Sequence, residues 1–170
     1  MAVFTAIRVV YPKQGADGCL EQEILRCTKD WSYGRDHHWR APRFDTILVR
    51  YQASDDFDEF GFTMHGRRVA RLWCVFQLNV FGAIKLALVE WFECSSRPEP
   101  DTNMYLVKKK HEYEVIELST IERGVHLIPD FGKEIGRTQR AKPGQPHGLD
   151  IFDRYVINNH LDQEIYNTIY

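Results

Sequence analysis

Residues 69–80 read VARLWCVFQLNV, and their apolar side chains recur at every second position. A period of two over this length is typical of a β-strand with one buried face. After Gly82, IKLALVEWF (84–92) is apolar on both faces, as in a strand at the centre of a sheet. We therefore expect a mainly β fold whose core is built largely from these two segments. The side chains expected in this core are Leu72, Cys74, Phe76, Leu78, Ile84, Leu86, Leu88 and Val89.

Shorter strand candidates lie on both sides of this pair. They are rich in β-branched or aromatic residues and span 3–10, 44–51, 104–109, 113–118 and 124–129. Between two of them, the basic residues from Lys108 to His111 are expected to form a hairpin tip. Short strands at this spacing favour a small barrel or curled sheet over an alternating β-α fold.

A single helix is expected, at the C-terminal end of the chain. Residues 152–169 place Leu161, Ile165 and Ile169 four positions apart, which predicts a helix whose apolar stripe packs on the sheet. The stretch before it is rich in glycine, proline and basic residues, as in an exposed connection. We expect one domain, 1–170, made of an N-terminal extension with a strand and a loop (1–43), a barrel core (44–131), a mobile linker (132–150) and a terminal helix (151–170).

Composition excludes several classes of protein. Lys and Arg total 22 against 24 for Asp and Glu, a formal net charge of -2, so a strongly basic protein that coats nucleic acid is excluded. No apolar run approaches the roughly 20 residues that a membrane span needs, and the first residues lack the pattern of a secretion signal. The four scattered cysteines are typical of a reducing compartment. We expect an intracellular domain.

Motifs that carry enzymatic chemistry are missing from the sequence. It contains no GxGxxG, GxxxxGK[ST] or GxSxG pattern. His37 and His38 are adjacent, and Cys19 and Cys27 have no second pair at the spacing of a zinc finger. The acidic run at 55–59 departs from the calcium-loop pattern. We therefore predict a protein that is not an enzyme, with no metal site and no cofactor.

Aromatic residues near the ends of the predicted strands are candidates for peptide recognition. Rings that converge can form a cage that holds a methylated lysine by cation–π attraction. The candidates are Tyr51, Trp73, Trp91 and Tyr105. The alternative is that the tryptophans belong to the core, which is the commoner fate of a tryptophan in an apolar strand.

Two basic segments are candidates for binding nucleic acid. In WSYGRDHHWRAPR (31–43) aromatic residues alternate with arginines, a pattern that suits stacking on bases and pairing with phosphates. The second segment is the expected linker. The candidate residues are Arg35, Arg40, Arg43, Lys133, Arg137, Arg140 and Lys142. The alternative for the first segment is a connection whose aromatic residues plug one end of the barrel.

The order of these signals resembles a bromo-adjacent homology (BAH) domain, a β-barrel interaction module of chromatin proteins. The matching residues are Asp45, Leu48, Val49, Trp91, Phe92, Arg97, Pro98, Glu99, Met104 and Tyr105. Residues 93–96 separate the Trp–Phe pair from Arg97, a departure from the family pattern. The resemblance implies a nuclear, chromatin-associated module that binds a histone tail or another protein peptide and performs no catalysis.

A longer series of phrases resembles the C-terminal tail of fungal transposases of the Plavaka and Kyakuja–Dileera–Zisupton groups. The phrases are RFDTILV (43–49), VEWF (89–92), MYLV (104–107), LSTIERGVHLIPDFG (118–132) and YVINNHLDQEIY (155–166). In those proteins the tail follows the nuclease core and is not its catalytic part. This resemblance implies, as an alternative, a DNA-binding accessory domain of a transposon-derived protein.

Overall fold

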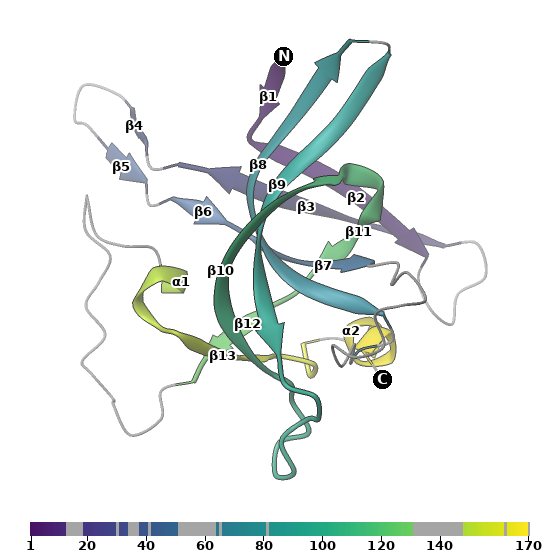
Figure 1. Ribbon diagram of the computed structural model, residues 1–170, viewed down its shortest axis with the longest axis vertical. Coiled ribbons are helices and arrows are strands. Elements are labelled where there is room, and N and C mark those ends of the chain that lie inside the picture. The colour runs from purple at the N-terminus through teal and green to yellow at the C-terminus, as the bar shows by residue number, and fades with distance from the viewer. Residues whose placement is uncertain are drawn as a thin grey trace.

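The computed structural model describes residues 1–12, 19–29, 31–33, 38–40, 42–50, 64, 66–80, 82–130, 148–161 and 163–169, with backbone alone at 31–33, 38–40, 148 and 163–164. The fold is mainly β, and its main sheet is strongly curled (Figure 1). This confirms the fold class that the period-two pattern predicts.

Long antiparallel strands form the centre of the main sheet. They are β7 (Thr46–Arg50), β8 (Arg67–Asn79), β9 (Ala83–Cys94) and β10 (Leu106–Glu117), followed by the 3-10 helix η2 (Leu118–Thr120). The remaining strands of this sheet are β1 (Ala2–Phe4), β11 (Ile121–Gly124), β12 (Leu127–Pro129) and β13 (Arg154–Ile157). The strand order is β11-β7-β8-β9-β10-β13-β12, and β1 pairs with the upper part of β8.

The N-terminal segment forms a second sheet and is part of the fold. Its strands are β2 (Ala6–Pro12), β3 (Leu20–Thr28) and β6 (Arg43–Phe44), in the order β2-β3-β6. A separate pair is formed by β4 (Trp31–Tyr33) and β5 (His38–Arg40). Figure 1 shows β2 and β3 crossing the upper part of the curled main sheet. The expected extension at 1–43 therefore contributes to the same body as the barrel core.

Two hydrophobic cores lie on opposite faces of the main sheet. The first core, toward β3 and β6, contains Leu25, Cys27, Phe44, Ile47, Val49, Ala70, Leu72, Val75, Ala87, Val89, Trp91 and Ile121. The second core, toward β13 and the C-terminus, contains Leu48, Met64, Val69, Phe92, Val107, Val125, Leu127, Tyr155, Ile157, Ile165 and Ile169. Because both faces are covered, the central strands can be apolar at nearly every position.

The predicted inward face of residues 69–80 is correct only over its first half. A register shift between Leu72 and Cys74 places a β-bulge in β8, so Val75 takes the inward direction that strict alternation assigns to Cys74. Cys74 is half-buried, and beyond the bulge Phe76 and Leu78 are half-buried too. On β9 the inward residues are correspondingly Ala87, Val89 and Trp91, whereas Leu86 and Leu88 are half-buried and Ile84 is exposed.

The expected hairpin tip at Lys108–His111 is wrong. Residues 106–117 form one continuous strand, β10, which pairs with β9 along its length. The register shifts between Lys109 and Glu112, and His111 has a φ of 55°, so a bulge stands where a turn is expected. The polar residues here interrupt the apolar pattern without ending the strand.

The single helix expected over 151–170 is also wrong in extent. Helix α1 spans Gly148–Ile151, Arg154–Ile157 form β13, and helix α2 spans Gln163–Ile169. Strand β13 pairs with β10 and β12, and this pairing buries Tyr155 and Ile157 in the second core. Ile165 and Ile169 pack as the stripe predicts, but Leu161 lies before α2 and is 58% exposed.

Candidate peptide-binding groove

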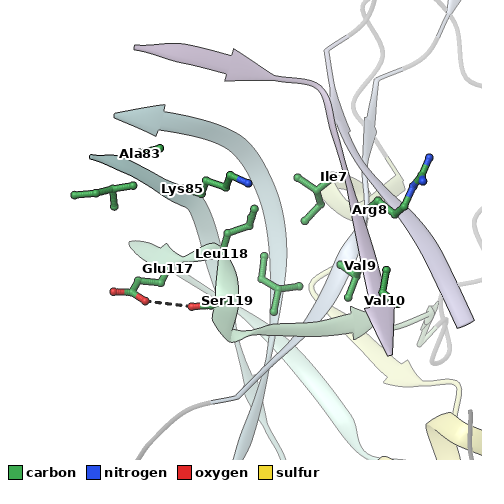
Figure 2. Close-up of a pocket in the computed structure, with 11 residues that line it drawn as sticks. Ile7, Arg8, Val9, Val10, Ala83, Lys85, Glu117, Leu118 and Ser119 are labelled. Atoms are coloured by element: carbon green, nitrogen blue, oxygen red, sulfur yellow. Dashed lines mark hydrogen bonds between the residues drawn. The ribbon is translucent and has the colours of Figure 1, made fainter. Parts of the chain in front are cut away.

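A groove of about 560 Å³ opens between β2 and the upper end of the first core (Figure 2). Its walls come from β2, from the start of β9 and from the segment that follows β10. The lining residues are Ile7, Arg8, Val9, Val10, Ala83, Ile84, Lys85, Glu117, Leu118, Ser119 and Ile121. The groove is therefore the place where the curled sheet and the N-terminal sheet leave a gap.

Strand edges border this groove on two sides. Within the described residues, β2 pairs with β3 alone, so its other edge borders the groove. Strand β10 ends at Glu117 opposite Leu86, so Ala83–Lys85 pair with β8 and have no ladder partner on the groove side among the described strands. An edge of this kind presents backbone N–H and C=O groups that can pair with another extended chain.

The side chains of the groove give it an apolar floor and a polar rim. Ile7, Val9 and Leu118 are half-buried and pack against the first core. Figure 2 shows Ile7 and Lys85 projecting into the space between β2 and β9. Val10, which also lines the groove, is 52% exposed. Apolar side chains at alternate positions beside an unpaired backbone edge are what recognition of an extended peptide requires.

A buried charged cluster lies on β8, β9 and α1, where Arg71 contacts Phe44 of the first core. The Arg71 side chain is 1% exposed and that of Glu90, its cross-strand partner, is 4% exposed. Nη1 of Arg71 lies 2.5 Å from Oδ1 of Asp150 and 3.9 Å from Oε2 of Glu90. The arginine therefore connects α1 to the two central strands and partly compensates the charge of the buried Glu90 carboxylate.

Glu90 accepts further hydrogen bonds from aromatic side chains around it. Nε1 of Trp73 donates to Oε2 of Glu90 at 3.0 Å, and the Tyr113 hydroxyl donates to Oε1 at 3.4 Å. Nδ1 of His111 also lies 3.4 Å from Oε1. Burial raises the pKa of Tyr113, and the neighbouring Glu90 carboxylate adds to this. The hydroxyl thus stays protonated and serves as a donor.

An aromatic cluster surrounds the guanidinium of Arg71. The Trp73 ring centroid lies 4.7 Å from that of Phe44 and 6.2 Å from that of Tyr113. The guanidinium carbon of Arg71 lies 4.3 Å from the Trp73 ring and 4.9 Å from the Phe44 ring. The cation at these rings is thus an arginine of the chain itself, which gives the cluster an architectural role.

The aromatic candidates within the described residues, Trp73, Trp91 and Tyr105, do not converge on one site. Trp91 is 2% exposed in the first core, its Nε1 donates to Glu114 at 2.7 Å, and Arg68 stacks on its ring at 4.1 Å. Trp73 belongs to the Arg71 cluster, and Tyr105 packs against the second core, where burial raises its pKa. Tyr51 lies outside the described residues. The described candidates are thus divided between the first core, which contains Trp91 and contacts Trp73, and the second core, which contacts Tyr105.

The predicted basic candidates lie mostly outside the described part. Arg35 and the four residues of the expected linker, Lys133, Arg137, Arg140 and Lys142, are not described, and Arg40 is described in its backbone alone. The Arg43 side chain is 57% exposed, and its Nε lies 2.8 Å from Oδ1 of Asp45.

Sequence reasoning missed the groove and the charged cluster for different reasons. The groove depends on which strand edges stay unpaired, a property that no local pattern reports. The cluster leaves a visible signal, because Arg71 and Glu90 are opposite charges that interrupt two apolar strands. Such residues are rarely fully buried unless they are paired.

The described residues form neither a cluster of metal-binding side chains nor a membrane-spanning helix. Among them, no group of three or more His, Cys, Asp or Glu side chains is arranged to hold a metal ion. The helices in the described part of the chain are all too short or too polar to span a membrane.

Comparison of the chain with protein-family models, with curated proteins and with solved structures gave no match. The resemblance to BAH domains and to transposase tails therefore stays a prediction.

Proposed function

We propose that this chain is a non-enzymatic interaction module that binds an extended peptide segment in the groove between β2 and β9. The observation that carries the proposal is the open edge of β2 over Ile7–Val10, which borders a groove with an apolar floor. A bound segment would pair its backbone with this edge and place alternate side chains against Ile7, Val9 and Leu118.

The size of the groove supports an occupant of this kind. A volume of about 560 Å³ falls in the range of roughly 300–1,000 Å³ typical of ligand-binding clefts. A segment inserted here would also cover edges that are otherwise open to non-specific strand pairing.

A histone tail or another chromatin protein is the partner that we propose from the resemblance to BAH domains. Because Trp73, Trp91 and Tyr105 do not form an aromatic cage, we propose that this partner binds at another surface. In our proposal the groove, rather than a cage formed by these rings, is the binding surface. DNA binding is the alternative, and its candidate residues lie almost entirely outside the described part.

The test is selection of linear peptides from a phage-displayed library, with histone-tail peptides in parallel. Enriched peptides are then titrated against the wild type and against Val10→Glu, which places a charge on an exposed residue that lines the groove. The matched control is Val115→Glu on β10, because Val115 is 51% exposed, close to the 52% of Val10, and does not line the groove.

We expect Val10→Glu to weaken binding at least about tenfold and Val115→Glu to leave it unchanged. The proposal is wrong if no peptide is enriched, or if both variants bind the enriched peptides as the wild type does. Circular dichroism of each variant establishes that the fold is retained.

A further inference from the structure

Lys85 is the charged side chain that enters the groove. It lies on β9 two residues before Ala87, so strand alternation directs it to the same face as Ala87 and Val89 of the first core. In Figure 2 its side chain extends from β9 toward Ile7 across the open space. Lys85 is exposed, and within the described structure its ammonium group has no ion-pair or hydrogen-bond partner.

One charged side chain projects into the groove. The lining includes Arg8, Lys85 and Glu117, but Figure 2 shows the Arg8 side chain on the side of β2 that faces away from the groove. The carboxylate of Glu117 accepts a hydrogen bond from Ser119 at 3.1 Å, and Figure 2 shows it directed away from Lys85. The ammonium of Lys85 is thus the charge that faces the open space of the groove.

From this arrangement we infer that the segment bound in the groove carries a carboxylate that pairs with Lys85, next to apolar side chains that contact Ile7, Val9 and Leu118. The inference rests on the proposed function and deepens it by naming the chemistry of the ligand: of the two partners proposed there, it selects an acidic segment of another chromatin protein over a histone tail, whose basic side chains would repel Lys85. An ion pair between Lys85 and a carboxylate of the bound segment is stronger than one on an open surface, because the bound segment excludes part of the surrounding water.

The carboxylate that we infer is an acidic side chain within the segment, and the free C-terminus of a protein is the alternative that the test separates. Backbone pairing with β2 is compatible with either source. Peptides that differ only in these groups distinguish them. One arm replaces Asp or Glu by Asn or Gln, and the other replaces the free C-terminal carboxylate by an amide.

The experiment repeats the phage selection on the wild type, on Lys85→Glu and on Lys85→Gln. The library is randomised at every position, so that charge preferences emerge without prior choice. The matched control for a change of charge outside the groove is Lys108→Glu, because Lys108 is an exposed lysine on β10 that does not line the groove.

We expect the wild type to enrich apolar peptides that carry one or more acidic residues, and we expect amidation of their C-terminus to leave binding unchanged. Lys85→Glu should bind them about tenfold or more weakly and should instead enrich peptides with Lys or Arg. Lys85→Gln should fall between the two, and Lys108→Glu should behave as the wild type does.

These outcomes test the carboxylate inference and the proposed function separately. Loss of binding in Val10→Glu, together with unchanged binding in Lys85→Glu and no acidic preference, overturns the carboxylate inference and leaves the groove as the site. Peptides that bind Val10→Glu and the wild type equally overturn the proposed function itself.

Discussion

Replacement of Arg71 by Met tests how much the buried charged cluster contributes to the fold. Arg71→Met keeps an unbranched apolar stem and removes the cation that faces Glu90, whose side chain is 4% exposed. Breaking a buried ion pair from one side costs about 3–5 kcal/mol, because it leaves the other charge buried without compensation. Trp73 and Tyr113 still donate hydrogen bonds to Glu90, so we expect a loss near the lower end, about 3 kcal/mol.

The assay is urea unfolding at neutral pH, followed by circular dichroism. With a slope of about 1–3 kcal/mol per molar urea, a loss of 3 kcal/mol lowers the midpoint by at least about 1 M. The double variant Arg71→Met/Glu90→Gln should recover much of this loss, since no unpaired charge then remains in the interior. Asp150→Asn should cost only about 1 kcal/mol, because the Asp150 side chain is 38% exposed.

The reasoning is refuted if Arg71→Met unfolds at the wild-type midpoint. It is also refuted if adding Glu90→Gln to Arg71→Met lowers the stability further, as an independent second substitution would. Either result would mean that solvent reaches Glu90 and that the cluster is not an internal ion pair.

The remaining predictions concern the first core and two groups with raised pKa values. Trp91→Ala should lower the free energy of unfolding by about 3–5 kcal/mol, measured by urea unfolding, because the ring is 2% exposed; an unchanged midpoint would show that the ring is not part of the core. Burial raises the pKa of Cys27 to about 11, so alkylation by iodoacetamide at pH 8, followed by mass spectrometry, should modify the exposed Cys19 far faster; equal rates would contradict this. Burial also raises the pKa of Tyr155 to about 12. Both groups are therefore held protonated in the folded state, and the stability that this contributes is complete below about pH 9 and is lost as the pH rises through 11 to 12. Urea midpoints measured across this range should fall, and a midpoint that rises with pH would contradict the assignment.

The strand pattern predicts the fold class because alternation reports burial directly. It places β8 and β9 correctly, since each is long and apolar enough to outweigh local irregularity. The bulge after Leu72 reverses the inward direction, and a single inserted residue leaves no mark in composition. The core residues beyond that point therefore could not be assigned by counting.

The C-terminal segment shows how tertiary pairing overrides a local pattern. Spacing alone suits a helix through Ile165, but Arg154–Ile157 pair with β10 and β12, and this pairing buries Tyr155. Strand β3 was not predicted because LEQEILRCT is rich in Glu, Gln and Arg, which have low β propensity. Its position is determined by pairing with β2 and by the burial of Leu25 and Cys27.

The candidate site depends on strand pairing and chain topology, which local sequence patterns do not report. The strand predicted at 3–10 is two strands in the structure, β1 and β2, which pair in different sheets. The groove depends on the unpaired edge of β2 and on the end of β10 at Glu117, which leaves Ala83–Lys85 of β9 without a ladder partner there among the described strands. Trp91 and Tyr105 attract attention as aromatic residues, yet each packs in a different core. Topology, rather than residue type, creates the groove.

Hydrogen exchange of the backbone amides of β2 most directly tests whether the groove binds an extended segment. The exchange rates of Ile7–Val10 are measured by NMR or mass spectrometry with and without a saturating peptide from the selection. Pairing with the edge of β2 predicts slower exchange in this segment and at Ala83–Lys85 on the opposite wall. Unchanged rates in both segments, with slowing confined to another part of the chain, would contradict the account.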